Sequence, residues 1–232
     1  MAEGLAKAGA DVAILDLNLD SAEQRSESIK KAGRRSLAIQ IDATSKQDII
    51  DAEKKIRREL GIVSILVNAP GINSSTPFFE LSEEEWHKIL DVNLKSIMLS
   101  CQIFAQVMID NRLPGSIINI SSASSGPPLS RVFTYGISKA GINNLTQFLA
   151  REWAEHNVRV NALAPGFFPA EQNRKVLTPD RIKSIMGHTP VNRFGEPEEL
   201  IGSTIWLASE RASSFVTGAI IRVDGGFTAM TI

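Results

Sequence analysis

Cysteine is nearly absent from this chain of 232 residues, which contains Cys101 alone. One cysteine cannot form an intrachain disulfide framework, and a reducing cytoplasm is the natural setting of such a chain. An excess of charge of one sign is lacking too, because the formal net charge is −1. A chain without a broad basic field is not expected to take nucleic acid as its main partner. No metal site is predicted.

Long apolar runs are also missing, since none approaches the ~18 residues of a membrane span, and no membrane partner is expected. The first seven residues lack the apolar stretch of a signal peptide and resemble an amphipathic helix already under way. Repeats, low-complexity tracts and linker-like segments are absent. With 43% hydrophobic and 22% charged residues, the composition predicts a single globular domain over residues 1–232.

The chain does contain a regular alternation of short apolar, β-branched runs and helical patterns. Strands are predicted at residues 12–15, 36–41, 62–67, 116–120, 158–163 and 219–223. Helices are predicted between them, at residues 20–32, 46–60, 83–110, 134–156 and 198–209. This alternation indicates βαβ units and a parallel sheet covered on both faces. The predicted fold class is α/β, a Rossmann-like doubly wound sheet with ligands at the carboxyl ends of its strands.

Tyr135 and Lys139 stand four positions apart in a predicted helix and therefore share one face. Such a pair, when isolated, is more often an ordinary surface pair. Three features favour a catalytic role for this pair. Tyr135 is the only tyrosine, and Ser122 lies 13 positions earlier (135 − 122), just after a predicted strand. Asn93 interrupts an apolar helical stretch, where a buried amide needs a partner.

At these residues the chain resembles the short-chain dehydrogenase/reductase family. The resemblance covers nearly the whole chain, at residues 68–71, 93, 115–122, 135–139, 158–166 and 215–226. It implies an oxidoreductase that interconverts a secondary alcohol and a ketone by hydride transfer with a nicotinamide dinucleotide.

The resemblance also implies a role for each residue of the group. Tyr135 would be the general acid/base, with its pKa lowered by the Lys139 cation and the nicotinamide. Lys139 would also hold the nicotinamide ribose. Ser122 would hydrogen-bond the substrate oxygen, and Asn93 would keep a water that links Lys139 to solvent. The alternative for Ser122 is a turn residue, because other serines surround it.

Two aspartates follow predicted strands and bear on the cofactor. Asp16 is placed to accept hydrogen bonds from the adenosine ribose and to repel a 2′-phosphate, so NAD is predicted over NADP. Its alternative is a turn or cap residue, a role for which Asp20 is the better candidate. Asp42 matches the family's adenine-contacting aspartate, and capping the next helix is its alternative.

Two turns resemble the family's cofactor-contacting turns. The first, residues 68–71, matches the family's turn only at its ends, Asn68 and Gly71. Pro70 removes a backbone donor and fixes φ, so a different local path around the adenosine is expected. The second, Pro165 and Gly166, matches the turn beside the nicotinamide.

The start of the chain departs from the family. The family begins with a strand and a Gly-rich turn that brings backbone amides to the pyrophosphate. Only Gly4 and Gly9 precede Asp16 here, without a Gly-x-Gly pattern. The missing strand would lie in the middle of the sheet and leave edges exposed. We expect an N-terminally incomplete domain whose true start lies upstream, and a damaged copy is the alternative.

The segment after Gly166 lies where the family carries its substrate lid. Its long polar side chains suit a hydroxylated, anionic substrate, although lids also face water and are polar for that reason. Residues 167–177 and 188–200 resemble the sugar-acid branch, meaning gluconate 5-dehydrogenases and D-mannonate oxidoreductases. The candidate substrate contacts are Ser124, Phe168, Gln172 and Arg174, the last for a carboxylate.

Two other functions stay open. One is a 3-oxoacyl carrier-protein reductase, which the same catalytic residues would serve. The other is a non-catalytic family member that cannot hold a dinucleotide. The resemblance further implies a cytoplasmic homotetramer formed through the helices at 83–110 and 134–156 and the strand near Val223.

Overall fold

The computed structural model of the chain describes residues 1–168 and 178–230. Its strands are β1 (Val12–Asp16), β2 (Ser36–Gln40), β3 (Ile65–Asn68), β4 (Gly115–Ile120), β5 (Val158–Pro165) and β6 (Ile220–Val223). Its α-helices are α1 (Ala2–Lys7), α2 (Leu19–Lys31), α3 (Lys46–Glu59), α4 (Glu83–Leu90), α5 (Ser96–Asp110), α6 (Phe133–Trp153), α8 (Pro179–Gly187), α9 (Glu199–Ala208) and α10 (Glu210–Ser213). Each predicted strand and helix is present.

Every strand pair is parallel, which confirms the predicted α/β fold class. The strands form two sheets, one of order β1-β2 and one of order β3-β4-β5-β6. In the part of the chain that the structure describes, β1 pairs only with β2, and β3 pairs only with β4.

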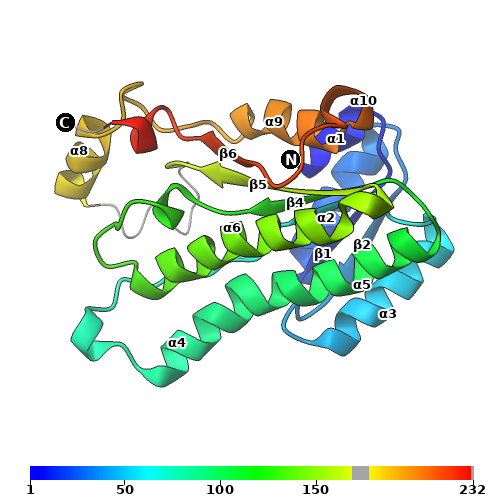
Figure 1. Cartoon of the computed structure of the whole chain (residues 1–232), viewed down its shortest axis with the longest axis horizontal. Helices are drawn as coiled ribbons and strands as arrows, with labels where there is room; N and C mark the ends of the chain where they lie inside the picture. The colour runs from blue at the N-terminus through cyan, green and yellow to red at the C-terminus, as the bar shows by residue number, and fades with distance from the viewer. Residues whose placement is uncertain (169–177, 231–232) are drawn as a thin grey trace.

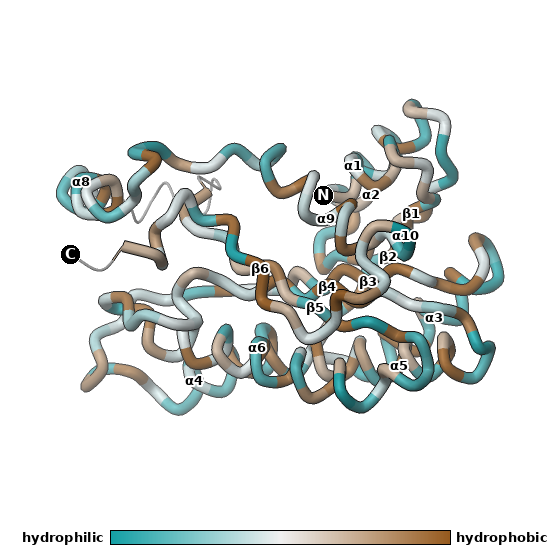
Figure 2. The backbone as a smooth tube through the Cα atoms, turned by 45° about the horizontal axis from the view of Figure 1, so that its top comes forward, coloured by the Kyte–Doolittle hydropathy of each residue, from teal (hydrophilic) through white to brown (hydrophobic). Residues whose placement is uncertain are grey.

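Helices cover both faces of the four-stranded sheet. Helices α4, α5 and α6 lie along one face, and α1, α9 and α10 lie on the other (Figures 1 and 2). The larger core joins α3, α5 and α6 to the sheet, and its fully buried members include Ile97, Met108, Ile117, Ile142 and Val160. Strand β5 is buried from Val158 to Ala164, as a central parallel strand should be.

The predicted helix at 83–110 consists of α4, a π-helical turn η2 (Asp91–Lys95) and α5. By length and composition alone, this continuous helix is apolar enough to cross a membrane. It holds no uninterrupted apolar run of that length, because polar residues such as Asn93, Lys95 and Gln102 divide it. Its side chains at Ile97, Phe104 and Met108 pack into the core of the domain.

The helix caps correct two predictions. Asn18, not Asp20, caps α2, since its side chain accepts a hydrogen bond from the Ser21 amide. Ser45, not Asp42, caps α3. In both cases the capping side chain directly precedes the first helical residue, where its oxygen can reach the free amides of the first turn. Ser82 caps α4 in the same way, by accepting a hydrogen bond from the Glu85 amide.

Candidate active site

The predicted catalytic residues come together where β4 leads into a short 3₁₀ turn, η3 (Ala123–Ser125), beside the start of α6. Ser122 follows β4 and caps η3 with its side chain. Helix α6 begins at Phe133, so Tyr135 and Lys139 lie in its first two turns on one face. Ser122 is 8% exposed and Lys139 is 3% exposed.

Tyr135 is partly buried, with the Lys139 Nζ atom 5.5 Å from the centre of its ring. Burial raises the pKa of Tyr135, because it penalises the phenolate, and a hydrogen bond with Ser122 opposes that rise. The predicted lowering of this pKa by Lys139 is therefore not found in the protein alone. The effect of burial is the larger one.

Lys139 is a buried cation held by the backbone of β4. Its Nζ atom donates a hydrogen bond to the Ile120 carbonyl at 2.8 Å, and burial lowers its pKa to about 8. An ammonium group has three donors, so this one bond leaves N–H groups for a ligand. The Ser121 hydroxyl donates to the Lys139 carbonyl at 3.2 Å and fastens the helix to the strand.

Asn93 lies in the π-helical turn η2 and is fully buried. Its Oδ1 atom accepts from the Ile72 amide at 2.8 Å, and its Nδ2 atom donates to the Ile72 carbonyl at 2.9 Å and to Ser138 Oγ at 3.1 Å. Ser138 Oγ in turn donates to the Tyr135 carbonyl at 2.7 Å. The expectation that this buried amide has partners is confirmed. It joins the turn after β3 to the catalytic helix.

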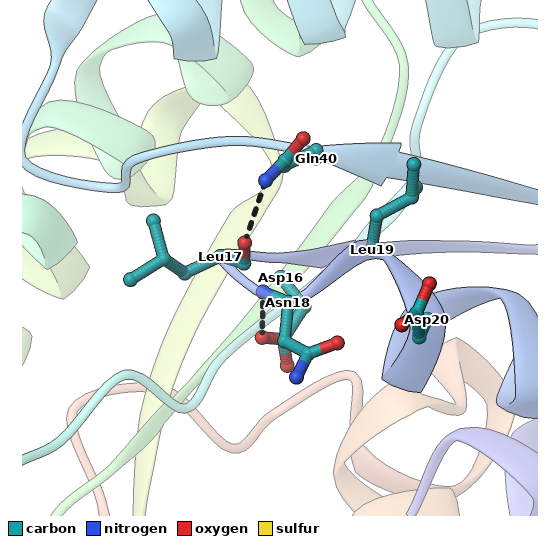
Figure 3. A pocket seen from close by; sticks show the side chains of 6 residues that line it. All are labelled: Asp16, Leu17, Asn18, Leu19, Asp20 and Gln40. Atoms are coloured by element: carbon teal, nitrogen blue, oxygen red, sulfur yellow. Dashed lines mark hydrogen bonds between the residues drawn. The ribbon is translucent and has the colours of Figure 1, made fainter.

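A second, separate region lies at the carboxyl ends of β1 and β2. An open hollow of about 540 Å³ is lined by Asp16, Leu17, Asn18, Leu19, Asp20 and Gln40 (Figure 3). The exposed Asp16 carboxylate accepts a hydrogen bond from the Asn18 amide at 2.9 Å. Gln40 Nε2 donates to the Leu17 carbonyl at 3.0 Å and closes the turn (Figure 3). Asp42 is not part of this lining and instead accepts bonds from the amide and hydroxyl of Thr44.

The two glycine-containing turns lie close to other parts of the site. A β-carbon on Gly71 would stand 3.7 Å from Lys139 Nζ. The Gly166 amide donates to the Val223 carbonyl at 2.9 Å, and a β-carbon on Gly166 would stand 2.7 Å from Asp224 Cα. Glycine is required at Gly166 by this close approach of two backbones.

The side chain of Asn68, unlike the rest of this turn, points into the core. Its Nδ2 atom donates to Asn119 Oδ1 at 2.9 Å and to Cys101 Sγ at 3.3 Å. Asn119 Nδ2 then donates to Thr146 Oγ1 at 3.0 Å. The sequence analysis missed this network of β3, β4, α5 and α6. Its signal was Asn119, an amide inside the otherwise apolar end of β4.

The candidate substrate contacts divide into two groups. Ser124 lies beside Ser122, with its Oγ atom 3.0 Å from Ser122 Oγ. The Phe168 ring packs against Gly195, where a β-carbon would stand 2.4 Å from it. Gln172 and Arg174 lie outside the described residues. No group of three or more His, Cys, Asp or Glu side chains able to hold a metal occurs in the described ranges.

Known proteins resemble this chain over nearly its whole length. The family model described as enoyl-(acyl carrier protein) reductase matches residues 1–228. The chain is 37% identical over 230 residues to the 2-dehydro-3-deoxy-D-gluconate 5-dehydrogenase of Dickeya dadantii, with 99% of this chain and 90% of that protein covered.

Solved structures give the same result. The gluconate 5-dehydrogenase of Burkholderia cenocepacia, in complex with NADP and tartrate, matches with a TM-score of 0.94 and 32% identity over 99% of this chain and 90% of that one. A 7α-hydroxysteroid dehydrogenase complexed with NADH matches with a TM-score of 0.92 and 31% identity over 97% and 87%. The chain belongs to the short-chain dehydrogenase/reductase family.

Proposed function

We propose that this chain is an NAD(P)-dependent oxidoreductase that interconverts a secondary alcohol and a ketone on a sugar acid. The observation that carries the proposal is the partly buried phenol of Tyr135, which has the Lys139 cation 5.5 Å from its ring centre and interacts with the Ser122 hydroxyl. The substrate class rests on relatives named as dehydrogenases of gluconate and of 2-dehydro-3-deoxy-D-gluconate. Arg174 remains our candidate for the carboxylate contact.

The residues present fit a dinucleotide at both of its ends. Among the described residues Lys139 Nζ has one acceptor, the Ile120 carbonyl, which leaves N–H groups for the hydroxyls of a ribose. The exposed Asp16 carboxylate borders the hollow at the end of β1 and suits the second ribose, with NAD favoured over NADP. Gly71 and the Pro165–Gly166 turn would line the space between them. A bound nicotinamide supplies the hydride acceptor or donor.

Each side chain of this site has its own role in the proton transfer. During alcohol oxidation the Tyr135 oxygen takes the proton of the substrate hydroxyl, and during ketone reduction it returns that proton. Ser122 donates a hydrogen bond to the same substrate oxygen and holds it in place. Together with the positive charge of a bound oxidised nicotinamide, the Lys139 ammonium would favour the phenolate that burial alone disfavours. Asn93 holds the turn beside Lys139, and a water kept there would link Lys139 to solvent.

An activity screen tests this function. The chain is mixed with NAD or NADP and with gluconate-class sugar acids, and absorbance of the reduced nicotinamide is followed. We expect turnover with a sugar acid and a loss of at least about 10³-fold in Tyr135→Phe, which lacks the acid/base. Turnover of a 3-oxoacyl thioester with NADPH but of no sugar acid would instead support the carrier-protein reductase.

The non-catalytic alternative needs its own test, because the chain has no Gly-x-Gly pattern before Asp16 and its sheet is divided in two. Calorimetric titration with NAD separates the two hypotheses. Micromolar binding supports the enzyme, whereas absence of binding up to millimolar NAD supports the non-catalytic protein.

We further infer a cytoplasmic homotetramer. Exposed apolar side chains on α6, including Phe148 at 62% exposure and Ile137 at 51%, support burial of this helix against a second copy. Native mass spectrometry should give four copies, and a monomer would contradict this assembly.

A further inference from the structure

The hydroxyl of Ser122 receives two hydrogen bonds from one residue. The Ser124 amide donates to Ser122 Oγ at 3.2 Å, and Ser124 Oγ donates to the same atom at 3.0 Å. Both serines are buried, at 8% and 6% exposure. A hydroxyl oxygen has two lone pairs and one proton. Because Ser124 occupies both lone pairs, the proton is the only hydrogen-bonding capacity that Ser122 has left.

Tyr135 is the residue of the site with which the Ser122 hydroxyl interacts. The hydrogen bond with Ser122 lowers the pKa of Tyr135 against the opposing effect of burial. Because both lone pairs of Ser122 Oγ already accept from Ser124, Ser122 can only be the donor in its bond with Tyr135. The donors therefore run in one direction, from Ser124 to Ser122 to Tyr135. Successive hydrogen bonds of this kind polarise one another in a buried site.

The turn that carries Ser124 is fixed against the catalytic helix. Asn143 Nδ2 on α6 donates to Ser125 Oγ at 2.8 Å. Asn143 lies one helical turn beyond Lys139, so η3 and the Tyr135–Lys139 face are held by the same helix. Lys139, on that face, is the charged group that the structure places against the Tyr135 ring.

We propose that Ser124 is a positioning residue that directs the Ser122 hydroxyl proton toward the reacting oxygen. The inference rests on the proposed function for the roles of Ser122 and Tyr135. It replaces the direct substrate contact expected for Ser124 with an action through Ser122.

The first test needs no cofactor, because Tyr135 is the only tyrosine in the chain. Its phenolate absorption is titrated in the wild-type chain and in Ser124→Ala, Ser122→Ala and Ser125→Ala, with circular dichroism to define the folded range. Ser124→Ala should raise the pKa of Tyr135 by about half a pH unit, in the same direction as Ser122→Ala. Ser125→Ala, which loses only the bond from Asn143, should leave the titration unchanged.

Three results would overturn the inference. One is a titration that shifts in Ser122→Ala but not in Ser124→Ala. Another is an equal shift in Ser125→Ala, which would indicate a general effect of loosening the turn. The third is no shift in either Ser122→Ala or Ser124→Ala, which would also remove the Ser122–Tyr135 pairing. Ser124→Thr keeps the hydroxyl and should titrate like the wild type.

Steady-state kinetics give the second test. A positioning role predicts that Ser124→Ala lowers kcat by about tenfold with KM nearly unchanged. A raised KM with an unchanged kcat would show direct substrate binding and would overturn the inference. A wild-type chain without turnover would contradict the proposed function, while the phenol titration would still decide the role of Ser124.

Discussion

Lys139 is a lysine held where a charge is costly. It is 3% exposed, and burial lowers its pKa to about 8 from the ordinary lysine value of 10.5. One carbonyl oxygen is its hydrogen-bond partner in the described part of the chain. A single neutral acceptor compensates only part of the desolvation of an ammonium group. The residue is therefore kept at the expense of stability, as is common for functional groups.

Replacing this lysine should stabilise the fold at neutral pH. We expect Lys139→Met to raise the free energy of unfolding at pH 7 by about 1–2 kcal/mol, after allowing for the lost bond to Ile120. Between pH 8 and 10.5 the unfolded wild type binds more protons than the folded one, so wild-type stability rises with pH relative to the variant. The advantage of Lys139→Met should shrink across that window. Urea unfolding at several pH values measures it, and a difference independent of pH would contradict the prediction.

Asp16 concerns the choice of cofactor. Its carboxylate is exposed at the edge of the hollow at the end of β1, where a 2′-phosphate would meet like charge (Figure 3). Asp16→Ser should improve the affinity for NADP relative to NAD by about tenfold. Asp20→Ser, which alters a second carboxylate of the same lining, is the matched control and should change the ratio little. Fluorescence titration with each dinucleotide gives the ratio, and equal effects of the two variants would count against a specific role for Asp16.

At the scale of single elements, the π-helical turn η2 depends on Asn93. This amide makes three hydrogen bonds, two to the backbone of Ile72 and one to Ser138. A π-helical turn inside an α-helix is uncommon and often lies at a functional site. Here it joins α4 to α5 at the position where the chain packs against the turn after β3.

Removing the amide should destabilise the domain. We expect Asn93→Ala to lower the free energy of unfolding by about 2 kcal/mol, because it leaves Ser138 and the Ile72 backbone without their partner. Asn111→Ala removes an exposed amide that bonds the Val107 carbonyl, and should cost less than about 1 kcal/mol. Chemical denaturation of both variants makes the comparison. Equal losses would mean that the buried hydrogen bonds of Asn93 contribute no more to the free energy of unfolding than the exposed bond of Asn111.

The elements themselves were largely predictable from the sequence, because apolar runs with clear boundaries set the strands and amphipathic patterns set the helices. The capping residues were harder. Asn18 and Asp20 are both good caps, and only the backbone path decides which oxygen meets the Ser21 amide. Helix α8 was not predicted, since its short and polar sequence follows a stretch that resembles a loop.

The catalytic residues were predicted from their spacing and from a family resemblance, but their environment was not. Spacing placed Tyr135 next to Lys139, whereas the direction of the pKa shift depends on burial, which the sequence does not fix. The partners of Asn68 lie 33 and 51 positions away, at Cys101 and Asn119. Long-range hydrogen bonds of this kind leave no periodic signal in the sequence.

At the scale of the whole molecule, the two sheets differ in how deeply their strands are buried and in how many of their edges are paired. Strands β1 and β2 form a two-stranded sheet whose residues are only half-buried or exposed. Strands β4 and β5 are buried at nearly every position and pair on both edges. A two-stranded sheet depends on side-chain packing, because it has few hydrogen bonds of its own.

This difference predicts uneven exchange of backbone amides. Amides of β1 and β2 should show protection at least about tenfold weaker than those of β4 and β5. Hydrogen exchange followed by mass spectrometry of the peptides that cover the four strands measures this ratio. Equal protection would mean that the two sheets open together as one unit.

The amide of Asn119 adds side-chain bonds to the sheet pairing of β3 with β4 and extends that connection to the helices. Through Asn68 and Thr146 it joins the end of β3 to the middle of α6, with Cys101 of α5 at the same point. If any one of these elements detaches, polar groups of the others lose their partners in an apolar interior, and leaving such groups unpaired costs free energy. Melting of the active-site end should therefore be concerted, so a ligand that holds β3 in place would tighten α6 as well. The buried amide of Asn119 thus couples the stability of β3 to that of α6.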